Sequence, residues 1–284
     1  MGKDNNYDSK SMNIRGDKLY DLNCPLIMGI INVTPDSFYK ESRMGNSSQL
    51  MDEVTAMIDG GAHIIDVGGI STRPGADLMT NTEELSRVIP AIKEIREKFP
   101  KILISVDTFR ADVAKQAVLV GANIINDVYG GRYDDKMFDT VAELQVPYIL
   151  MHSRGDASNM KSLDNYNDVA ADVCLELSEN LWELRAKGVK DIIIDPGFGF
   201  AKNVEQNYEL LKHLSVLNLL ECPVLIGVSR KSMIYKLLNS SPQEALNGTS
   251  VLNTIGLVKN ASIIRVHDVK EASEVAKIVR NLMR

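Results

Sequence analysis

The sequence lacks the long apolar runs, the basic excess and the clustered cysteines that mark several large classes of protein. Its 284 residues contain no run that approaches 18 apolar residues, and the first ten residues are polar, so we expect neither a membrane-spanning helix nor a secretory signal. A net charge of -6 disfavours a surface for nucleic acid or anionic lipid. The three cysteines, Cys24, Cys174 and Cys222, match no zinc or redox spacing. We therefore expect a soluble cytoplasmic protein with reduced thiols.

Short apolar runs alternate with longer amphipathic stretches along most of the chain. The apolar runs are residues 26–31, 63–67, 102–106, 123–128, 147–151, 191–195, 224–228 and 262–266. The amphipathic stretches are residues 48–59, 82–98, 110–120, 134–144, 165–187, 204–214, 231–239 with 242–259, and 270–283. The first set is typical of buried parallel strands and the second of helices that cover them.

Eight strand–helix units of this kind predict an α/β fold, a (β/α)8 TIM barrel. A doubly wound open sheet is the alternative, but the glycine-rich dinucleotide fingerprint of that fold is missing. Residues 11–23 contain a Gly16-Asp17 turn between short alternating segments, which predicts a hairpin that caps the barrel floor. We expect residues 1–10 to be disordered or tag-like and residues 11–284 to form one domain.

Hydrogen-bonding side chains stand at the ends of several predicted strands. They are Asn32, Asp66, Asp107, Asn126, Asp195, Arg265 and His267. Any one of them could be a turn or cap residue. In a barrel, however, all strand ends meet on one face, so we expect these side chains to share a pocket. The mixture of acids, amides and cations suits a ligand with a hydrogen-bonding heterocycle at one end and an anionic group at the other.

Five segments at these strand ends carry distinctive motifs: NVTPDSF (32–38), STRPG (71–75), DPGFGF (195–200), SRKS (229–232) and RVHDV (265–269). Glycines allow close approach of the backbone to a ligand, and Thr72 and Arg73 can donate to anionic oxygens. Lys231 precedes a predicted helix, whose N-terminus favours an anion. The long connections 33–47 and 68–81 are expected to be mobile binding loops.

These motifs, in this order and at similar spacing, resemble those of dihydropteroate synthases, the folate-pathway enzymes that sulfonamides inhibit. The resemblance runs from about residue 25 to the C-terminus. It implies a transferase that joins 6-hydroxymethyl-7,8-dihydropterin diphosphate to 4-aminobenzoate, releasing pyrophosphate and forming 7,8-dihydropteroate. It also implies a homodimer of pterin-binding barrels and sulfonamides as competitive inhibitors.

The resemblance further implies a role for each matching residue. The pterin would be held by Asp107, Asn126, Asp195, Lys231 and Arg265, with Asp66 nearby in the pocket. The diphosphate would contact Asn32, Thr72, Arg73, Arg265 and His267, and Asn32 would ligate Mg2+, the expected cofactor. The 4-aminobenzoate would contact Phe38, Thr72, Pro74, Phe200, Lys231 and Ser232. Asp107, Arg265, His267 and Lys231 would be the catalytic residues, in an SN1-like reaction in which pyrophosphate leaves before the amine attacks.

Two other functions stay open on the sequence. One is a methyltransferase that passes a methyl group from methyltetrahydrofolate to a corrinoid, and the other is a pterin-binding paralogue without catalysis. The first would not need the four motifs NVTPDSF, STRPG, SRKS and RVHDV, and the second predicts the loss of residues such as Asn32 or His267, which are intact.

Some residues are expected to be structural, and some depart from the family pattern. We expect His152 to pack a loop, His63 to lie on the barrel floor and Asp127 to orient the loop that follows its strand. Many relatives have Glu where Ile70 stands, and the segment Ala201–Asn203 (AKN) replaces the usual GK followed by Ser or Thr. These departures bear on loop closure and inhibitor response rather than on the reaction.

Overall fold

The computed structural model describes residues 11–14, 18–22, 24–33, 43–69, 79–155 and 159–283. Its strands are β1 Ser11–Ile14, β2 Lys18–Asp21, β3 Leu26–Asn32, β4 Ile64–Gly68, β5 Leu103–Asp107, β6 Ile124–Asp127, β7 Tyr148–Met151, β8 Ile192–Asp195, β9 Leu225–Ile226 and β10 Ile263–Val266. Its helices are α1 Arg43–Gly60, α2 Asn81–Lys98, α3 Ala111–Leu119, α4 Met137–Leu144, α5 Val169–Ala186, α6 Val204–Lys212, α7 Ser232–Tyr235, α8 Leu246–Val258 and α9 Val269–Leu282. Short 3-10 helices span Met160–Ser162, Leu214–Leu220 and Pro242–Glu244.

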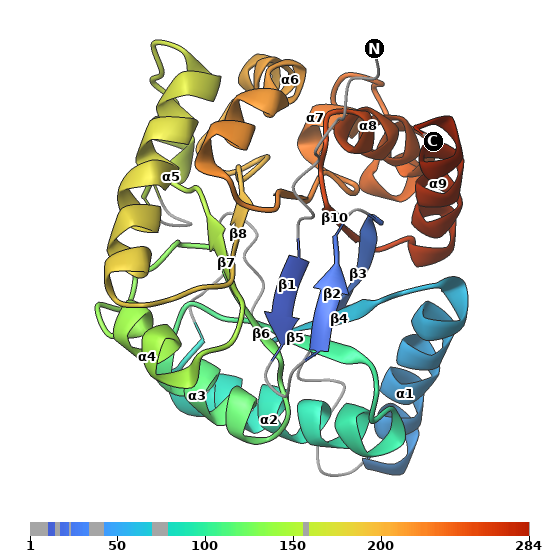
Figure 1. The fold of residues 1–284 in the computed structure, drawn as a ribbon. Helices are drawn as coiled ribbons and strands as arrows, with labels where there is room; N and C mark the ends of the chain where they lie inside the picture. The colour runs from blue at the N-terminus through green and yellow to red at the C-terminus, as the bar shows by residue number, and fades with distance from the viewer. Residues whose placement is uncertain are drawn as a thin grey trace, which may run out of the picture.

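Within these ranges, parallel strands form an eight-stranded sheet in the order β8-β7-β6-β5-β4-β3-β10-β9. A parallel bridge between Ile194 in β8 and Val224, immediately before β9, brings the two edges of the sheet together. The sheet is therefore a nearly closed barrel, and the helices surround it (Figure 1). The predicted (β/α)8 barrel is confirmed. No helix in the described ranges is both long enough and apolar enough to cross a membrane.

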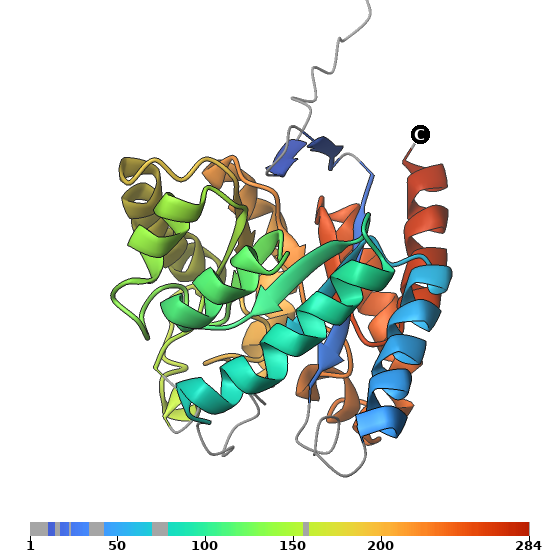
Figure 2. The same cartoon turned by 90° about the horizontal axis from the view of Figure 1, so that it is seen from below.

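The floor of the barrel is filled by one apolar layer that points inward. Each strand of the barrel contributes a buried side chain to it: Met28, Ile64, Leu103, Ile124, Ile149, Ile193, Leu225 and Ile263. Met12 and Leu22 of the N-terminal hairpin pack against this layer. The hairpin lies across the end of the barrel (Figure 2), where the backbone N–H of Asn13 donates to Asp191 Oδ1 at 2.8 Å. It therefore caps the floor, as predicted.

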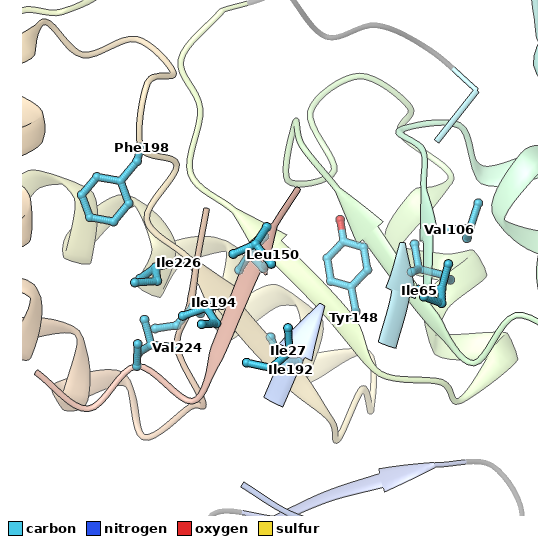
Figure 3. Packing of buried hydrophobic residues seen from close by; sticks show 14 of the residues in the cluster. Ile27, Ile65, Val106, Tyr148, Leu150, Ile192, Ile194, Phe198, Val224 and Ile226 are labelled. Carbon is cyan, nitrogen blue, oxygen red and sulfur yellow. The ribbon is translucent and has the colours of Figure 1, made fainter. Parts of the chain in front are cut away.

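A larger core lies between the barrel and its helices. Because side chains alternate along a strand, the neighbours of the inward layer point outward against the helices. Figure 3 shows part of this core, including Ile65, Val106, Leu150 and Ile194. Each fully buried aliphatic side chain of this kind stabilises the fold by about 1.5–3 kcal/mol relative to an exposed one. The strands are apolar on both faces here because both faces are covered.

Several predicted helices begin or end at other residues than expected; α1, for example, begins at Arg43 instead of residue 48. Residues 134–136 do not start α4, because the Asp134 carboxylate accepts hydrogen bonds from the backbone N–H groups of Ala111 and Lys136. Helix α5 begins at Val169 instead of 165, because Asp168 caps it by accepting from the N–H groups of Ala170 and Ala171. The stretch 231–239 is helical only at Ser232–Tyr235. That short helix has few aligned peptide dipoles, so its N-terminus is a weaker anion site than predicted.

Candidate active site

A polar layer lies directly above the apolar floor, toward the ends of the strands. Two residues after Ile64, Ile124, Ile193 and Ile263, the chain presents Asp66, Asn126, Asp195 and Arg265. The alternation of side chains along a strand places these polar residues on the same inward face as the floor. Asp66, Asn126 and Asp195 are buried. Apolar side chains thus fill the floor of the barrel, and polar side chains line the interior toward its opposite end.

Arg265 is at the centre of this layer. Its Nε donates to Asp66 Oδ2 at 2.7 Å, and its Nη2 donates to Asp107 Oδ2 at 2.6 Å. Asn126 Nδ2 donates to the same Asp66 oxygen at 3.1 Å. The second oxygen of Asp66, Oδ1, is buried and has no hydrogen-bond partner among the described residues. Four of the predicted pocket residues therefore form one hydrogen-bonded group.

The sheet register explains the space next to the Asp107 side chain, on the side that faces β4 and β3. In the register Asp107 is paired with Asn126 on one side and with Gly68 on the other, and Gly68 is paired with Asn32. A Cβ atom at Gly68 would lie 3.4 Å from Asp107 Cβ and 3.7 Å from Asn32 Oδ1. Glycine therefore leaves an open space between the Asn32 amide and the Asp107 carboxylate. Asn32 is exposed at the mouth of the barrel.

A tight turn follows Asp195. The backbone N–H of Gly197 donates to Asp195 Oδ1 at 2.8 Å, and Gly197 has a φ of +69°. A Cβ atom at Gly197 would lie 1.9 Å from the backbone oxygen of His152, so only glycine fits. Lys231 Nζ donates to the backbone oxygen of Phe198, and it lies 4.9 Å from the centre of the Phe200 ring.

Phe200 and His267 differ in their contacts and exposure. Phe200 is half-buried and packs against the cluster of Phe109, Val128, Tyr129 and Met151. His267 is exposed, and its Nδ1 lies 3.0 Å from Ser229 Oγ. The neighbouring Arg230 makes a bidentate ion pair with Asp268, at 3.0 Å for Nε–Oδ2 and 2.5 Å for Nη2–Oδ1. This pair joins the SRKS segment to the RVHDV segment.

Burial and neighbouring charges shift the pKa values of several groups. Burial raises the pKa of Asp107 to about 7, although Arg265 acts in the opposite direction and Asp66 adds to the rise. Burial lowers the pKa of Lys231 to about 8, with Asp195 opposing the shift. The pKa of Asp195 is also raised, because burial outweighs the effect of Lys231. The pKa of Arg265 is raised because Asp66 and Asp107 outweigh the effect of burial, so this side chain stays charged. Acids and bases that change charge near neutral pH are common in functional sites.

Several predicted contacts fall outside the described residues. Phe38, Thr72, Arg73 and Pro74 lie in the ranges 34–42 and 70–78, as does Ile70. Of the predicted residues in the described ranges, Asp66, Asp107, Asn126 and Arg265 touch one another, and Asp195 and Lys231 meet on the turn at 197–200. Ser232 begins α7 directly after Lys231. Asn32 and His267 lie at the mouth, at the ends of β3 and β10.

The residues expected to be structural have structural contacts. His63 Nδ1 accepts the backbone N–H of Ile27 at 3.0 Å, at the floor end of the barrel. Asp127 accepts from the N–H groups of Tyr129 and Gly131 and from the hydroxyl of Tyr148, so it orients the loop after β6. His152 is buried and contacts Lys202 and Glu176. Lys202, which binds the turn at 197–200 from inside the protein, was missed. No pattern of side chains in the sequence indicates its contacts with backbone oxygens.

The side chains of this pocket can bind a flat, hydrogen-bonding ring and an anion beside it. Carboxylates and amides of Asp195, Asp107 and Asn126 can accept and donate along the edge of such a ring. Arg265, Lys231 and His267 supply positive charge or N–H donors on the open side. The described residues include no group of three or more His, Cys, Asp or Glu that could hold a metal. A metal here would need most of its ligands from water or from the bound molecule.

Comparison with known proteins decides the family. The family described as "Pterin binding enzyme" matches residues 28–267. The dihydropteroate synthase of Bacillus subtilis (strain 168) is 43% identical over 256 residues, which cover 89% of this chain and 87% of that protein. This chain belongs to the pterin-binding enzymes, among the dihydropteroate synthases.

Solved structures of dihydropteroate synthases have the same fold. The Yersinia pestis enzyme in complex with a sulfonamide drug superposes with a TM-score of 0.89 at 38% identity, over 96% of this chain and 99% of that one. The Xanthomonas albilineans enzyme in complex with 7,8-dihydropteroate superposes with a TM-score of 0.84 at 33% identity, over 96% of this chain and 98% of that one. The resemblance inferred from the motifs is thus confirmed over nearly the whole chain.

One departure from the dihydropteroate synthase pattern has a visible structural consequence. Ala201 has a φ of +49°, in the left-handed region where the family's usual glycine is comfortable and alanine is strained. Asn203, which stands in place of Ser or Thr, caps α6 by accepting from the N–H of Gln206 at 2.9 Å. Asn is as good a cap as Ser or Thr, so this replacement preserves the local structure.

Proposed function

We propose that this protein catalyses the dihydropteroate synthase reaction: 6-hydroxymethyl-7,8-dihydropterin diphosphate and 4-aminobenzoate give 7,8-dihydropteroate and pyrophosphate. The observation that carries the proposal is the hydrogen-bonded group of Asp66, Asp107, Asn126 and Arg265 above the apolar floor. It is an inward-facing polar surface of the kind that a pterin ring requires, in a chain of the right family. The bound product in the Xanthomonas albilineans relative supports the same chemistry.

In this proposal the pterin lies in the deep polar layer. A 2-amino-4-oxopyrimidine presents a ring N–H and an exocyclic amine side by side, and one carboxylate can accept both. Asp195 is the proposed acceptor, because one of its oxygens is already oriented by the N–H of Gly197. Asn126 and Lys231 contact the other edges, and the Arg265 guanidinium covers the ring face. A ligand that lacks one of these two donors loses much of its affinity, which makes the pocket selective.

The diphosphate and its metal are proposed to occupy the mouth of the barrel. Arg265 and His267 would bind the diphosphate oxygens, together with Thr72 and Arg73. Asn32 offers a single hard amide oxygen next to the open space left by Gly68. Mg2+ usually takes one or two protein ligands and completes its octahedron with water and substrate phosphate. The residues present therefore fit the ion, which when bound would neutralise charge on the leaving pyrophosphate.

The 4-aminobenzoate is proposed to bind on the outer side of the pterin. Phe200 would line its ring, and Lys231 and Ser232 would bind its carboxylate, with Phe38, Thr72 and Pro74 completing the site. Sulfonamides would compete for this place, consistent with the drug complex of the Yersinia pestis relative. Since Lys231 lies 4.9 Å from the Phe200 ring centre, the carboxylate partner and the ring partner are already adjacent.

The reaction we favour is dissociative. The C–O bond to the diphosphate breaks first, and its electron pair leaves with pyrophosphate, which Arg265 and His267 stabilise. The electron-rich dihydropterin spreads the resulting positive charge, and the Asp107 carboxylate lies beside the pterin to stabilise it. The neutral arylamine then attacks the methylene carbon, and the new C–N bond forms with loss of a proton. An arylamine is nucleophilic when neutral, so the pocket needs no strong base.

The test is pyrophosphate release from the pterin diphosphate, measured with and without Mg2+ and with and without 4-aminobenzoate. We expect release over many turnovers that requires both and yields dihydropteroate, because the amine must trap the cation before the next cycle. Asn32→Ala should raise the Mg2+ concentration needed for half-maximal rate about tenfold, because one of few protein ligands is lost. The exposed Asn218→Ala is the matched control and should leave it unchanged. Tight pterin binding without turnover would instead indicate a pterin-binding paralogue or a methyltransferase.

We also propose that the protein is a cytoplasmic homodimer that pairs through its late helices. Apolar side chains exposed on α8 and α9, including Val251, Ile255 and Ile278, support a face that needs cover. Cys24, Cys174 and Cys222 form no disulfide with one another, which suits a reducing compartment. Light scattering on the purified protein tests the dimer. A monomer at micromolar concentration would contradict it.

A further inference from the structure

A buried lysine lies under the turn that carries the predicted pocket residues. Lys202 is 9% exposed, and its Nζ lies within hydrogen-bond distance of three acceptors. These are the backbone oxygens of Gly197 at 3.1 Å and Phe200 at 3.0 Å, and Nδ1 of His152 at 3.0 Å. A protonated amine has three N–H donors, so this set matches one ammonium group and leaves no donor unused.

The contacts of His152 fix how that ring is protonated. Its Nε2 lies 3.1 Å from Glu176 Oε2, and a carboxylate can only accept, so Nε2 carries the proton. Its Nδ1 is then free to accept from Lys202. Glu176 is itself held by Arg154, whose Nε donates to Oε1 at 2.9 Å. The chain of contacts from helix α5 to the turn is therefore continuous: Arg154, Glu176, His152, Lys202 and the two carbonyl groups.

Lys202 binds one face of the turn at residues 197–200, and Lys231 binds the opposite face, which we place in the pocket. Between Gly197 and Phe200, the backbone oxygen of Phe198 points to Lys231, which donates to it. The Phe200 ring lies 4.9 Å from the same Lys231 ammonium. Two lysines thus bind alternate carbonyl groups of one short turn, Lys202 from within the protein and Lys231 from the pocket side.

We propose that Lys202, oriented by His152, is a positioning residue that sets the place of the Phe200 ring and of the Lys231 ammonium in the 4-aminobenzoate subsite. The inference rests on the proposed function, because it gives those two groups a substrate. Asp195 is less dependent on Lys202: it lies on β8, and its backbone oxygen accepts from the N–H of His152 at 2.8 Å. Lys231 also contacts the pterin in the proposed function, but Asn126 and Arg265 are held by Asp66 and Asp107, away from this turn. The pterin subsite should therefore tolerate the loss of Lys202 better than the 4-aminobenzoate subsite.

The test compares the two KM values in variants that remove or keep the contact. Lys202→Met fills the space without donors, and His152→Leu removes the acceptor that orients Lys202. Both should raise the KM for 4-aminobenzoate about tenfold, while the KM for the pterin diphosphate changes less than about threefold. His152→Asn, whose amide oxygen can stand in for Nδ1, should stay within about threefold for both substrates. Lys212→Met, an exposed lysine on α6, is the matched control.

A crystal structure of Lys202→Met tests the position of the Phe200 ring without relying on enzyme activity. The proposal expects the Phe200 ring to move by about 1 Å or more, enough to disturb a substrate contact. An unmoved ring, or equal rises in both KM values, would overturn it, as would a drop in melting temperature with both KM values unchanged. If Lys202→Met does not fold, the same measurements on His152→Leu decide the question. If the wild type has no activity, the proposed function is wrong. The effect of Lys202 on the turn can still be tested, because the displacement of Phe200 in the variant structure does not depend on activity.

Discussion

The Arg265 guanidinium and the Asp107 carboxylate lie 2.6 Å apart, measured from Nη2 to Oδ2, although 158 positions separate them in the chain. The same guanidinium is 2.7 Å from Asp66 on its Nε side. One cation thus serves two buried carboxylates, and its orientation is fixed by strands β4, β5 and β10 together. A guanidinium held in this way needs little rearrangement when a substrate arrives, which is the condition for strong electrostatic stabilisation.

The first prediction concerns the Asp107 carboxylate. Asp107→Asn keeps the size of the side chain but removes the negative charge that we propose lies beside the pterin. We expect kcat to fall about 10²- to 10³-fold, because charge stabilisation in a site of low polarity is lost. The affinity for the pterin, measured by calorimetry, should change far less.

The control for this variant is Asp135→Asn, which removes one negative charge at an exposed position before α4. It should leave kcat unchanged. A fall of less than about threefold in Asp107→Asn would show that the carboxylate does not stabilise the reacting group.

The second prediction is a narrow pH profile for kcat/KM. Asp107, with a pKa of about 7, loses its charge as the pH falls, and Lys231, with a pKa of about 8, loses its charge as the pH rises. In the proposed mechanism the active form has Asp107 ionised and Lys231 protonated, so kcat/KM should fall on both sides of a maximum between about pH 7 and 8. Lys231→Met should lose the alkaline limb and keep the acid limb. A profile with both limbs intact in that variant would mean that another group titrates.

Alternation of side chains allowed the barrel and the deep half of the pocket to be predicted from the sequence. The apolar runs give the strands, and a polar residue near the end of each run, such as Asp66, Asn126 or Asp195, falls on the inward face by geometry alone. The strand order follows from the barrel closing on itself. Asp107, Asn126 and Arg265 were therefore brought together correctly, although no residue near any one of them in the sequence indicates the others.

Contacts between side chains and backbone groups could not be predicted from the sequence. Lys202 binds two carbonyl groups, and carbonyl groups are the same in every residue, so no pattern of side chains points to them. The late start of α4 also depends on local competition, because Asp134 binds N–H groups at the start of α3 instead of joining a helix. Such hydrogen bonds by short polar side chains compete with helix formation and shift boundaries by a few residues.

The third prediction concerns stability in mild acid. Burial lowers the pKa of His152 to about 4, and the charge of Lys202 adds to the effect. The unfolded histidine takes up a proton below about 6.5, whereas the folded one does so only near 4, so stability is lost as the pH falls between these values. The free energy of unfolding should drop by roughly 2 kcal/mol from pH 6.5 to pH 5 on account of this residue.

His152→Asn should remove most of that slope when unfolding by urea is followed at pH 7, 6 and 5. His63, whose pKa is also lowered by burial, acts in the same range and should leave a small residual slope. His213 is exposed on the surface, so His213→Asn is the control and should leave the slope as it is. An equal slope in wild type and His152→Asn would show that His152 is protonated in the fold.

The last prediction separates steric conflict from backbone strain at two glycines. Gly197 and Gly188 have φ values of +69° and +84°, so alanine is strained at both. At Gly188 nothing lies within 4 Å of an added Cβ atom, whereas at Gly197 the His152 backbone oxygen would be 1.9 Å away. Gly188→Ala should therefore cost about 1 kcal/mol of stability and leave kcat unchanged. Gly197→Ala should cost more than about 3 kcal/mol, because backbone atoms cannot move aside cheaply. Similar losses in urea unfolding would show that the turn after Asp195 can relax, and the tight backbone contact with His152 would then not hold the pocket.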